Sequence, residues 1–130
     1  MTSDELIAEA RAAAANAYAP FSGFRVGAVV VDADGSHYSG ANVENSAFGS
    51  GICAEGSAIS RAVSAGARTL DTVAVAGLDT SEPVYPCGNC RQLMVEFRVG
   101  RVIVETPDGP RVHTLEELIP HGFRLDPGVA

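Results

Sequence analysis

The spacing of apolar residues predicts helices and strands in alternation along this chain. Near the N-terminus apolar positions recur every three or four residues, which is typical of one buried helix face. They are Leu6, Ile7, Ala10, Ala14 and Ala17. We expect this helix over residues 4–18, with Thr2 and Glu5 at capping-box spacing and Pro20 beyond its end. Two strand-like runs follow, residues 24–31 and 37–43, joined through Asp34-Gly35, a hairpin signal.

The second half of the chain continues the alternation. Helices are expected over residues 54–65 and 88–97, and a last one over 114–119 begins with a Thr114–Glu117 capping box. Short β-branched runs predict strands at 72–76, 101–105 and 111–113. The order α-β-β-α-β-α-β-β-α predicts an α/β, three-layer α-β-α fold with a central mixed five-stranded sheet. We expect an antiparallel first hairpin and parallel later crossovers.

Length and composition narrow the function classes. A chain of 130 residues fits one domain, residues 1–130, with its own core. Asp and Glu outnumber Lys and Arg by 16 to 9, and no basic cluster interrupts them, which argues against a nucleic-acid partner. The longest apolar run, residues 26–31, is too short for a membrane, and no signal peptide is recognisable. Three cysteines cannot all pair, so we expect a reducing, cytoplasmic location.

Two cysteine-containing segments supply the candidate chemistry. They are Cys53-Ala54-Glu55 and Pro86-Cys87-Gly88-Asn89-Cys90. A closed structural zinc site takes four protein ligands, whereas a catalytic one keeps a position free for water or substrate. Both segments fall at predicted helix starts, where partial positive charge stabilises thiolates. Three thiols with an acid nearby therefore indicate an open zinc site.

Other interpretations of these residues remain open. Cys87 and Cys90 alone could form a redox pair, and Cys53 could be a small buried hydrophobe. A structural zinc site could instead take its fourth ligand from a histidine, although none has a recognisable ligand spacing. The candidates are His37, His113 and His121.

Both cysteine segments match motifs of one class of zinc enzyme. Zinc deaminases carry His-x-Glu and Pro-Cys-x-x-Cys motifs, and here Cys53-x-Glu55 and Pro86-Cys87-x-x-Cys90 take their places. Further matching segments extend over nearly the whole chain. They are Tyr18-Ala19-Pro20-Phe21-Ser22, Phe24, Val26-Gly27-Ala28, Gly40-Ala41-Asn42-Val43-Glu44-Asn45, Cys90-Arg91-Gln92, and Leu118-Ile119-Pro120 with Phe123. With all of these segments, the chain resembles the small homotetrameric cytidine deaminases.

This resemblance implies a function and a role for each site residue. It implies hydrolytic deamination of cytidine and 2′-deoxycytidine in pyrimidine salvage, with one Zn²⁺ per subunit. Cys53, Cys87 and Cys90 would hold the zinc, and Glu55 would shuttle protons. The remaining assignments concern the nucleoside. The backbone of Ala54 would recognise the base, Phe24, Asn42 and Glu44 would surround the sugar, and Phe123 would stack on the base from a neighbouring subunit of a tetramer.

Two positions depart from the family pattern. Gly56 stands where many members carry an arginine that hydrogen-bonds two ligand sulfurs, and Phe48 stands where tyrosine is common. Arg91 is the nearest other cation in sequence. Neither departure touches a ligand or the proton shuttle, so we expect retained deaminase activity. The alternatives are deamination of a modified cytosine nucleoside such as blasticidin S, and a noncatalytic zinc-dependent nucleoside-binding protein.

Overall fold

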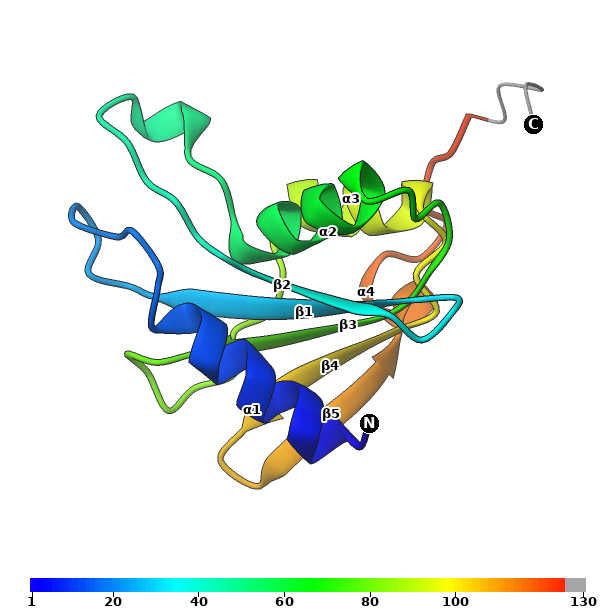
Figure 1. Ribbon diagram of the computed structural model, residues 1–130, viewed down its shortest axis with the longest axis horizontal. Helices are drawn as coiled ribbons and strands as arrows, with labels where there is room; N and C mark the ends of the chain where they lie inside the picture. The colour runs from blue at the N-terminus through cyan, green and yellow to red at the C-terminus, as the bar shows by residue number, and fades with distance from the viewer. Residues whose placement is uncertain (126–130) are drawn as a thin grey trace.

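The computed structural model describes residues 1–125 and shows a five-stranded sheet between two layers of helices (Figure 1). The order of elements is the predicted one. The helices are α1 (Ser3–Ala14), α2 (Ala54–Ser64), α3 (Gly88–Glu96) and α4 (Leu115–Leu118), with a 3₁₀ turn at Phe48–Ser50. The strands are β1 (Val26–Asp32), β2 (His37–Ala41), β3 (Leu70–Gly77), β4 (Arg101–Thr106) and β5 (Gly109–Thr114).

The sheet is mixed, as the sequence predicts. Its strand order is β2-β1-β3-β4-β5. Strand β1 runs antiparallel to both β2 and β3, β3 runs parallel to β4, and β4 and β5 form an antiparallel hairpin. Gly35 closes the first hairpin with φ +86°, a backbone conformation that glycine adopts without strain. The expected directions of the first hairpin and of the later crossovers are therefore confirmed.

Within residues 1–125, helix α1 alone covers one face of the sheet. Its apolar stripe and three strands, β1, β3 and β4, together form one buried cluster. The members are Leu6, Ile7, Ala10, Val29, Ala74, Ala76 and Ile103. The Thr2–Glu5 capping box is present, but the predicted end at residue 18 is wrong. The helix ends at Ala14 because the chain tightens into a turn at Asn16 and Ala17, and Tyr18 leaves to pair with Val43.

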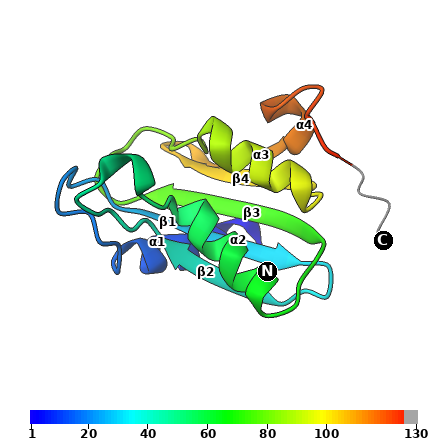
Figure 2. The ribbon, with the colours of Figure 1, turned by 90° about the horizontal axis from the view of Figure 1, so that it is seen from above.

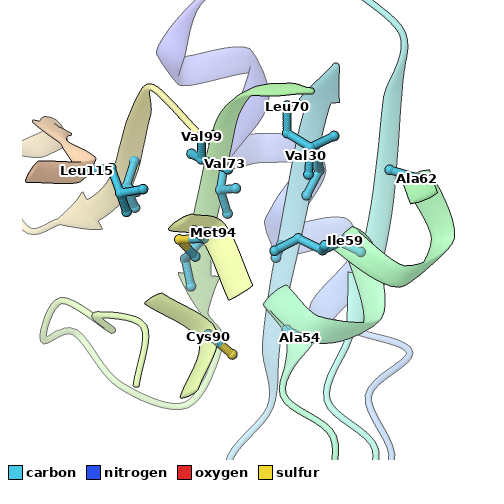
Figure 3. Close-up of a cluster of buried hydrophobic side chains, with 14 of the residues drawn as sticks. Val30, Ala54, Ile59, Ala62, Leu70, Val73, Cys90, Met94, Val99 and Leu115 are labelled. Carbon is cyan, nitrogen blue, oxygen red and sulfur yellow. The ribbon is translucent and has the colours of Figure 1, made fainter. Parts of the chain in front are cut away.

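Helices α2 and α3 lie side by side over the opposite face (Figure 2). Figure 3 shows Ile59 of α2 and Met94 of α3 directed toward the strands between them, and both are fully buried. Alanines at the α2 contact allow its close approach, as does Gly40 in β2. This layer matters for function because both cysteine segments open its two helices.

Strand β2 is shorter than expected. The prediction extended it to residue 43, but regular pairing ends at Ala41. The side-chain oxygen of Asn42 accepts the Val26 N–H at 2.8 Å, so this side chain takes a bond that the strand ladder would otherwise use. No helix within residues 1–125 has the length and apolar character needed to cross a membrane.

Candidate active site

Three thiols from two helix starts converge above the sheet. Cys53 is the N-cap of α2, Cys87 is the N-cap of α3, and Cys90 lies in the first turn of α3. The three sulfur atoms all lie within 4.8 Å of one another, and the Cys53 and Cys87 sulfurs are 3.8 Å apart. Figure 3 shows the Cys90 sulfur directed toward the start of α2, near Ala54. The predicted convergence of the two segments is confirmed.

The donor set fits zinc. A tetrahedral ion with Zn–S bonds of about 2.3 Å separates its sulfur ligands by roughly 3.8 Å, which is the observed Cys53–Cys87 spacing. Three thiolates leave one tetrahedral position for water or substrate. Across residues 1–125 no histidine joins the thiol group. Two of the histidines have other partners, since His37 pairs with Glu9 and His113 contacts Tyr85 and Glu117.

The electrostatics of the thiols favour a cation between them. Burial raises the pKa of Cys53 and of Cys90. The negative charges of Cys87 and Glu55 raise both further, and that of Cys53 also raises the pKa of Cys90. Burial also raises the pKa of Cys87, but hydrogen bonds from the Cys90 and Asn89 backbone and from the other two thiols outweigh it and lower the net value. A divalent cation would remove the mutual repulsion of such thiolates.

Glu55 lies in the first turn of α2, close enough for its charge to act on Cys53 and Cys90, and is buried, with only 4 % of its surface exposed. Burial raises the pKa of its carboxyl, and a hydrogen bond from its own backbone N–H offsets this in part. No arginine, lysine or histidine of the described chain forms an ion pair with it. A buried carboxyl without a fixed cation can bind and release a proton, which suits a proton shuttle.

Phe24, Asn42 and Glu44 form a second group around the loop before β1. The Asn42 amide donates to the Phe24 carbonyl at 2.8 Å. The Glu44 carboxylate accepts the Phe21 and Ser22 backbone N–H groups at 3.0 and 3.1 Å, and also the Ser22 hydroxyl. These bonds, the Ser22 side chain first, lower the pKa of Glu44. Asn42 and Glu44 therefore order the loop that carries Phe24.

One residue pair connects this second group to the thiols. Val43 lies between Asn42 and Glu44, and its backbone exchanges two 2.9 Å hydrogen bonds with Ile52, the residue before Cys53. Next to this bridge is a hollow of about 320 Å³, where the Phe21 and Phe48 rings meet edge to face with centroids 5.1 Å apart. Its lining is Phe21, Ser22, Glu44, Asn45, Phe48 and Gly51, without the cysteines or Glu55.

The other two predicted site residues lie at opposite extremes of exposure. Ala54 opens α2 and is buried, beside the thiols. Phe123 exposes 66 % of its surface, and its backbone carbonyl accepts a 2.7 Å hydrogen bond from Gln92. Its side chain forms no aromatic pair within residues 1–125.

The structure also places two residues that the sequence left open. The Arg91 guanidinium donates to the carbonyls of Pro86 and Leu118, at 2.8 and 2.6 Å, and these two bonds direct it to backbone oxygens rather than to a sulfur. At Gly56 an added Cβ would meet only the Ile52 Cγ2, at 3.7 Å, which is ordinary contact. A Cβ at position 56 therefore fits without displacing a neighbour.

Comparison with known proteins gives a consistent result. The family described as "Cytidine and deoxycytidylate deaminase zinc-binding region" matches residues 1–106. A cytidine deaminase of Halalkalibacterium halodurans is 47 % identical over 124 residues, 93 % of each chain. One of Sporosarcina psychrophila is 46 % identical over 104 residues, 80 % of this chain and 76 % of that protein. The crystal structure of cytidine deaminase from Burkholderia pseudomallei superposes with a TM-score of 0.87 at 41 % identity, covering 95 % of this chain and all of that one.

Proposed function

The chain belongs to the cytidine and deoxycytidylate deaminase family and is a zinc-using, hydrolytic cytidine deaminase, and we propose that it converts cytidine and 2′-deoxycytidine to uridine and 2′-deoxyuridine. The observation that carries the proposal is the buried Glu55 carboxyl beside three converging thiols. In the reaction, water oxygen bonds to C4 of the ring, the C4–N bond breaks, and ammonia leaves.

Each site residue has a chemical task in this proposal. Cys53, Cys87 and Cys90 hold one Zn²⁺ per subunit, which supplies positive charge that brings the pKa of a water close to neutrality. Glu55 accepts a proton from the attacking water at its carboxylate oxygen and gives it to N3 of the ring. It then delivers the second proton to the departing amino nitrogen. The raised pKa of Glu55 supports this task, because the carboxyl must both accept and donate near neutral pH.

In this proposal the second group, Phe24, Asn42 and Glu44, binds the sugar, and the backbone of Ala54 recognises the base. An amide has two donors and two acceptor positions, and the bonds of Asn42 to Phe24 and Val26 use one of each. Glu44 likewise keeps an acceptor position beside its three bonds to Phe21 and Ser22. Both residues can therefore bind a ribose hydroxyl and still keep the hydrogen bonds that order the loop. Phe24 borders the sugar. Ala54 begins α2, where backbone N–H groups are free to meet the base.

Glu55→Gln tests the mechanism. Glutamine keeps the shape of the side chain but cannot carry the proton, so ammonia release should fall by about 100-fold or more, while zinc content and the circular dichroism spectrum stay unchanged. Glu116→Gln, at an exposed position of α4, is the matched control. Conversion is followed by the ultraviolet change from cytidine to uridine. Full activity in Glu55→Gln would overturn the mechanism.

The substrate range is tested by turnover of cytidine, 2′-deoxycytidine and blasticidin S. The Asn42 and Glu44 pair favours an unmodified sugar, because polar groups placed to bind a hydroxyl reward its presence and penalise its absence. The net charge of −7 favours a free nucleoside over a polynucleotide. We propose that residues 1–130 act as one domain in pyrimidine salvage. A reducing cytoplasm would keep the three ligand thiols unoxidised.

We further propose a homotetramer in which Phe123 completes the site of a neighbouring subunit. The exposed aromatic rings support it, since Phe48 and Phe123 expose 74 % and 66 % of their surface. Mixing inactive Glu55→Gln chains with Phe123→Ala chains tests the sharing. Some sites in mixed tetramers would combine an intact Glu55 with an intact Phe123, so activity should rise above that of either variant alone. Additive activity on mixing would contradict the shared site.

A further inference from the structure

Residues 113–124, which we call the C-terminal segment, lie against the start of α3 and the loop that precedes it. Figure 2 shows α4, which belongs to this segment, beside α3. Leu118 and Ile119 pack against the buried cluster that contains Cys90 and Met94. The segment passes so close to α3 that a Cβ at Gly122 would lie 2.9 Å from the Val95 Cγ2. It is therefore tightly apposed to the helix that carries two of the three thiols.

Arg91 makes the central connection between the two parts. Its Nε donates to the Pro86 carbonyl at 2.8 Å and its Nη1 donates to the Leu118 carbonyl at 2.6 Å. Pro86 is buried and directly precedes Cys87, and Leu118 ends α4. We call residues 85–87, which lead into α3, the ligand loop. One partly buried guanidinium thus joins this loop to a segment 27 residues away, and its two donors have a fixed relative geometry.

Two further hydrogen bonds flank this connection. The hydroxyl of Tyr85, before Pro86, lies 2.9 Å from the His113 Nε2. On the other side, the Gln92 side-chain amide donates to the Phe123 carbonyl at 2.7 Å. The contacts of Tyr85, Arg91 and Gln92 with the C-terminal segment therefore extend from the start of the ligand loop to the turn of α3 that follows Cys90.

Cys87 is the ligand that most needs such support. Cys90 is buried within α3, whereas Cys87 is exposed and stands at the N-cap of that helix. The three residues before it belong to no helix or strand. Packing therefore fixes Cys90 but leaves Cys87 to be placed by the backbone around Pro86, whose carbonyl Arg91 holds.

We propose that Arg91 is a positioning residue that fixes Cys87 relative to Cys90 by joining the ligand loop to the C-terminal segment. This inference rests on the proposed roles of Cys87 and Cys90 as zinc ligands. Arg91 acts through the backbone and reaches neither the substrate nor a sulfur by these bonds. Residues that orient metal ligands in this way change metal affinity by about 10- to 100-fold when they are replaced.

The test measures zinc release without any nucleoside. Zinc-loaded full-length protein is mixed with an excess of a chromogenic chelator, and the rate of transfer is followed. Arg91→Gln should release zinc about 10- to 100-fold faster than the unmodified chain. Arg91→Lys should also release it faster, because one ammonium cannot reproduce the two-armed guanidinium contact. Both variants are first checked for native circular dichroism, and the lysine variant carries the test if the glutamine variant fails to fold.

Arg68→Gln is the matched control. The Arg68 guanidinium also donates to two backbone carbonyls, those of Val63 and Ala67 at 2.9 and 2.8 Å, but beyond the far end of α2. Its zinc release should stay at the unmodified rate. Equal acceleration in Arg68→Gln would mean general destabilisation and would overturn the inference. Zinc release from Arg91→Gln at the rate of the unmodified chain would also overturn it. If Arg91→Gln released zinc faster but Arg91→Lys did not, the positive charge at position 91, and not the two-armed guanidinium contact, would be what retains zinc.

The outcome is separable from the proposed function. Glu55→Gln tests deamination and should leave zinc release unchanged. If the unmodified chain binds no zinc, the proposed function fails at the first step. If zinc binds and Arg91→Gln releases it at the unmodified rate, only the positioning role fails.

Discussion

Gly40 decides how close α2 can lie to the sheet, and replacing it gives the most direct test of how the fold places the site. A Cβ at Gly40 would lie 2.5 Å from the Ala58 backbone nitrogen and 2.9 Å from the Ala58 Cα. Ordinary contact begins near 3.4 Å. Backbone atoms cannot rotate aside, so Gly40→Ala requires α2 to move outward by about 1 Å in a close-packed interior.

This movement reaches the proposed site because Cys53 and Glu55 stand at the start of α2. A misplacement of about 1 Å can lower a rate by ~100-fold, so we expect a loss of that size in kcat/KM per folded molecule. Overpacking should also lower the free energy of unfolding by about 1–3 kcal/mol. Activity is measured from the ultraviolet change on cytidine and divided by the folded fraction from circular dichroism.

Gly27→Ala is the control for this experiment. Gly27 lies in β1 and faces α1, where a Cβ would contact the Ala10 carbonyl oxygen and lie 2.5 Å from the Ala14 nitrogen. The clash is at least as severe, but α1 covers the face without site residues. Gly27→Ala should therefore lose stability while the folded fraction keeps its kcat/KM. Retained activity in Gly40→Ala, or an equal loss in both variants, would refute the reasoning.

Three further predictions concern an ion pair, the core and the charge of the site. Hydrogen bonds from Arg25 lower the pKa of Asp79 below its unfolded value, so the stabilisation is present above about pH 4 and is lost as the pH falls. Urea unfolding should therefore show Asp79→Asn less stable than the unmodified chain at pH 7, with a difference that narrows as the pH falls below about 4. Met94→Ala should cost about 2–5 kcal/mol in the same assay, because Met94 is fully buried, whereas Val112→Ala on exposed β5 should cost under about 0.5 kcal/mol. Gly56→Arg should move the pH–rate profile toward lower pH, and Gly56→Ala should not.

The sequence predicts much of this fold because its local signals agree. The stripe of α1, the two capping boxes and the β-branched runs all indicate the elements that form. The convergence of the thiols also follows from local information, because both cysteine segments are helix starts and adjacent helices on one face bring their starts together. Ligand type and helix position are thus readable from the chain itself.

What the sequence misses is decided by contacts between distant segments. The early end of β2 depends on the Asn42 side chain taking the Val26 N–H, a bond that no spacing rule foretells. The destination of Arg91 depends likewise on Leu118 lying beside it. The tight approach at Gly27 and Gly40 appears only when helices and strands are packed, since glycine in a strand pattern has several explanations.

The charge of the proposed zinc site shows why position 56 is worth changing. Three thiolates and one Zn²⁺ carry a net charge of about −1, which makes the ion a weaker Lewis acid. Arg91 directs its two bonds to backbone carbonyls rather than to a sulfur. The partial positive charge of the free N–H groups at the two helix starts must therefore balance the excess negative charge of the thiolates.

An arginine at position 56 would add a full positive charge in the first turn of α2. A Cβ there would contact only the Ile52 Cγ2, at 3.7 Å, so the first side-chain atom fits. Either substitution also removes a glycine from the first turn of α2, which can stabilise the helix by up to about 1 kcal/mol, so Gly56→Ala isolates that effect. The added charge should lower the pKa of the attacking water and shift the acid limb of kcat/KM against pH downward. If Gly56→Arg binds zinc fully and its profile matches that of Gly56→Ala, the helix starts already balance the thiolates.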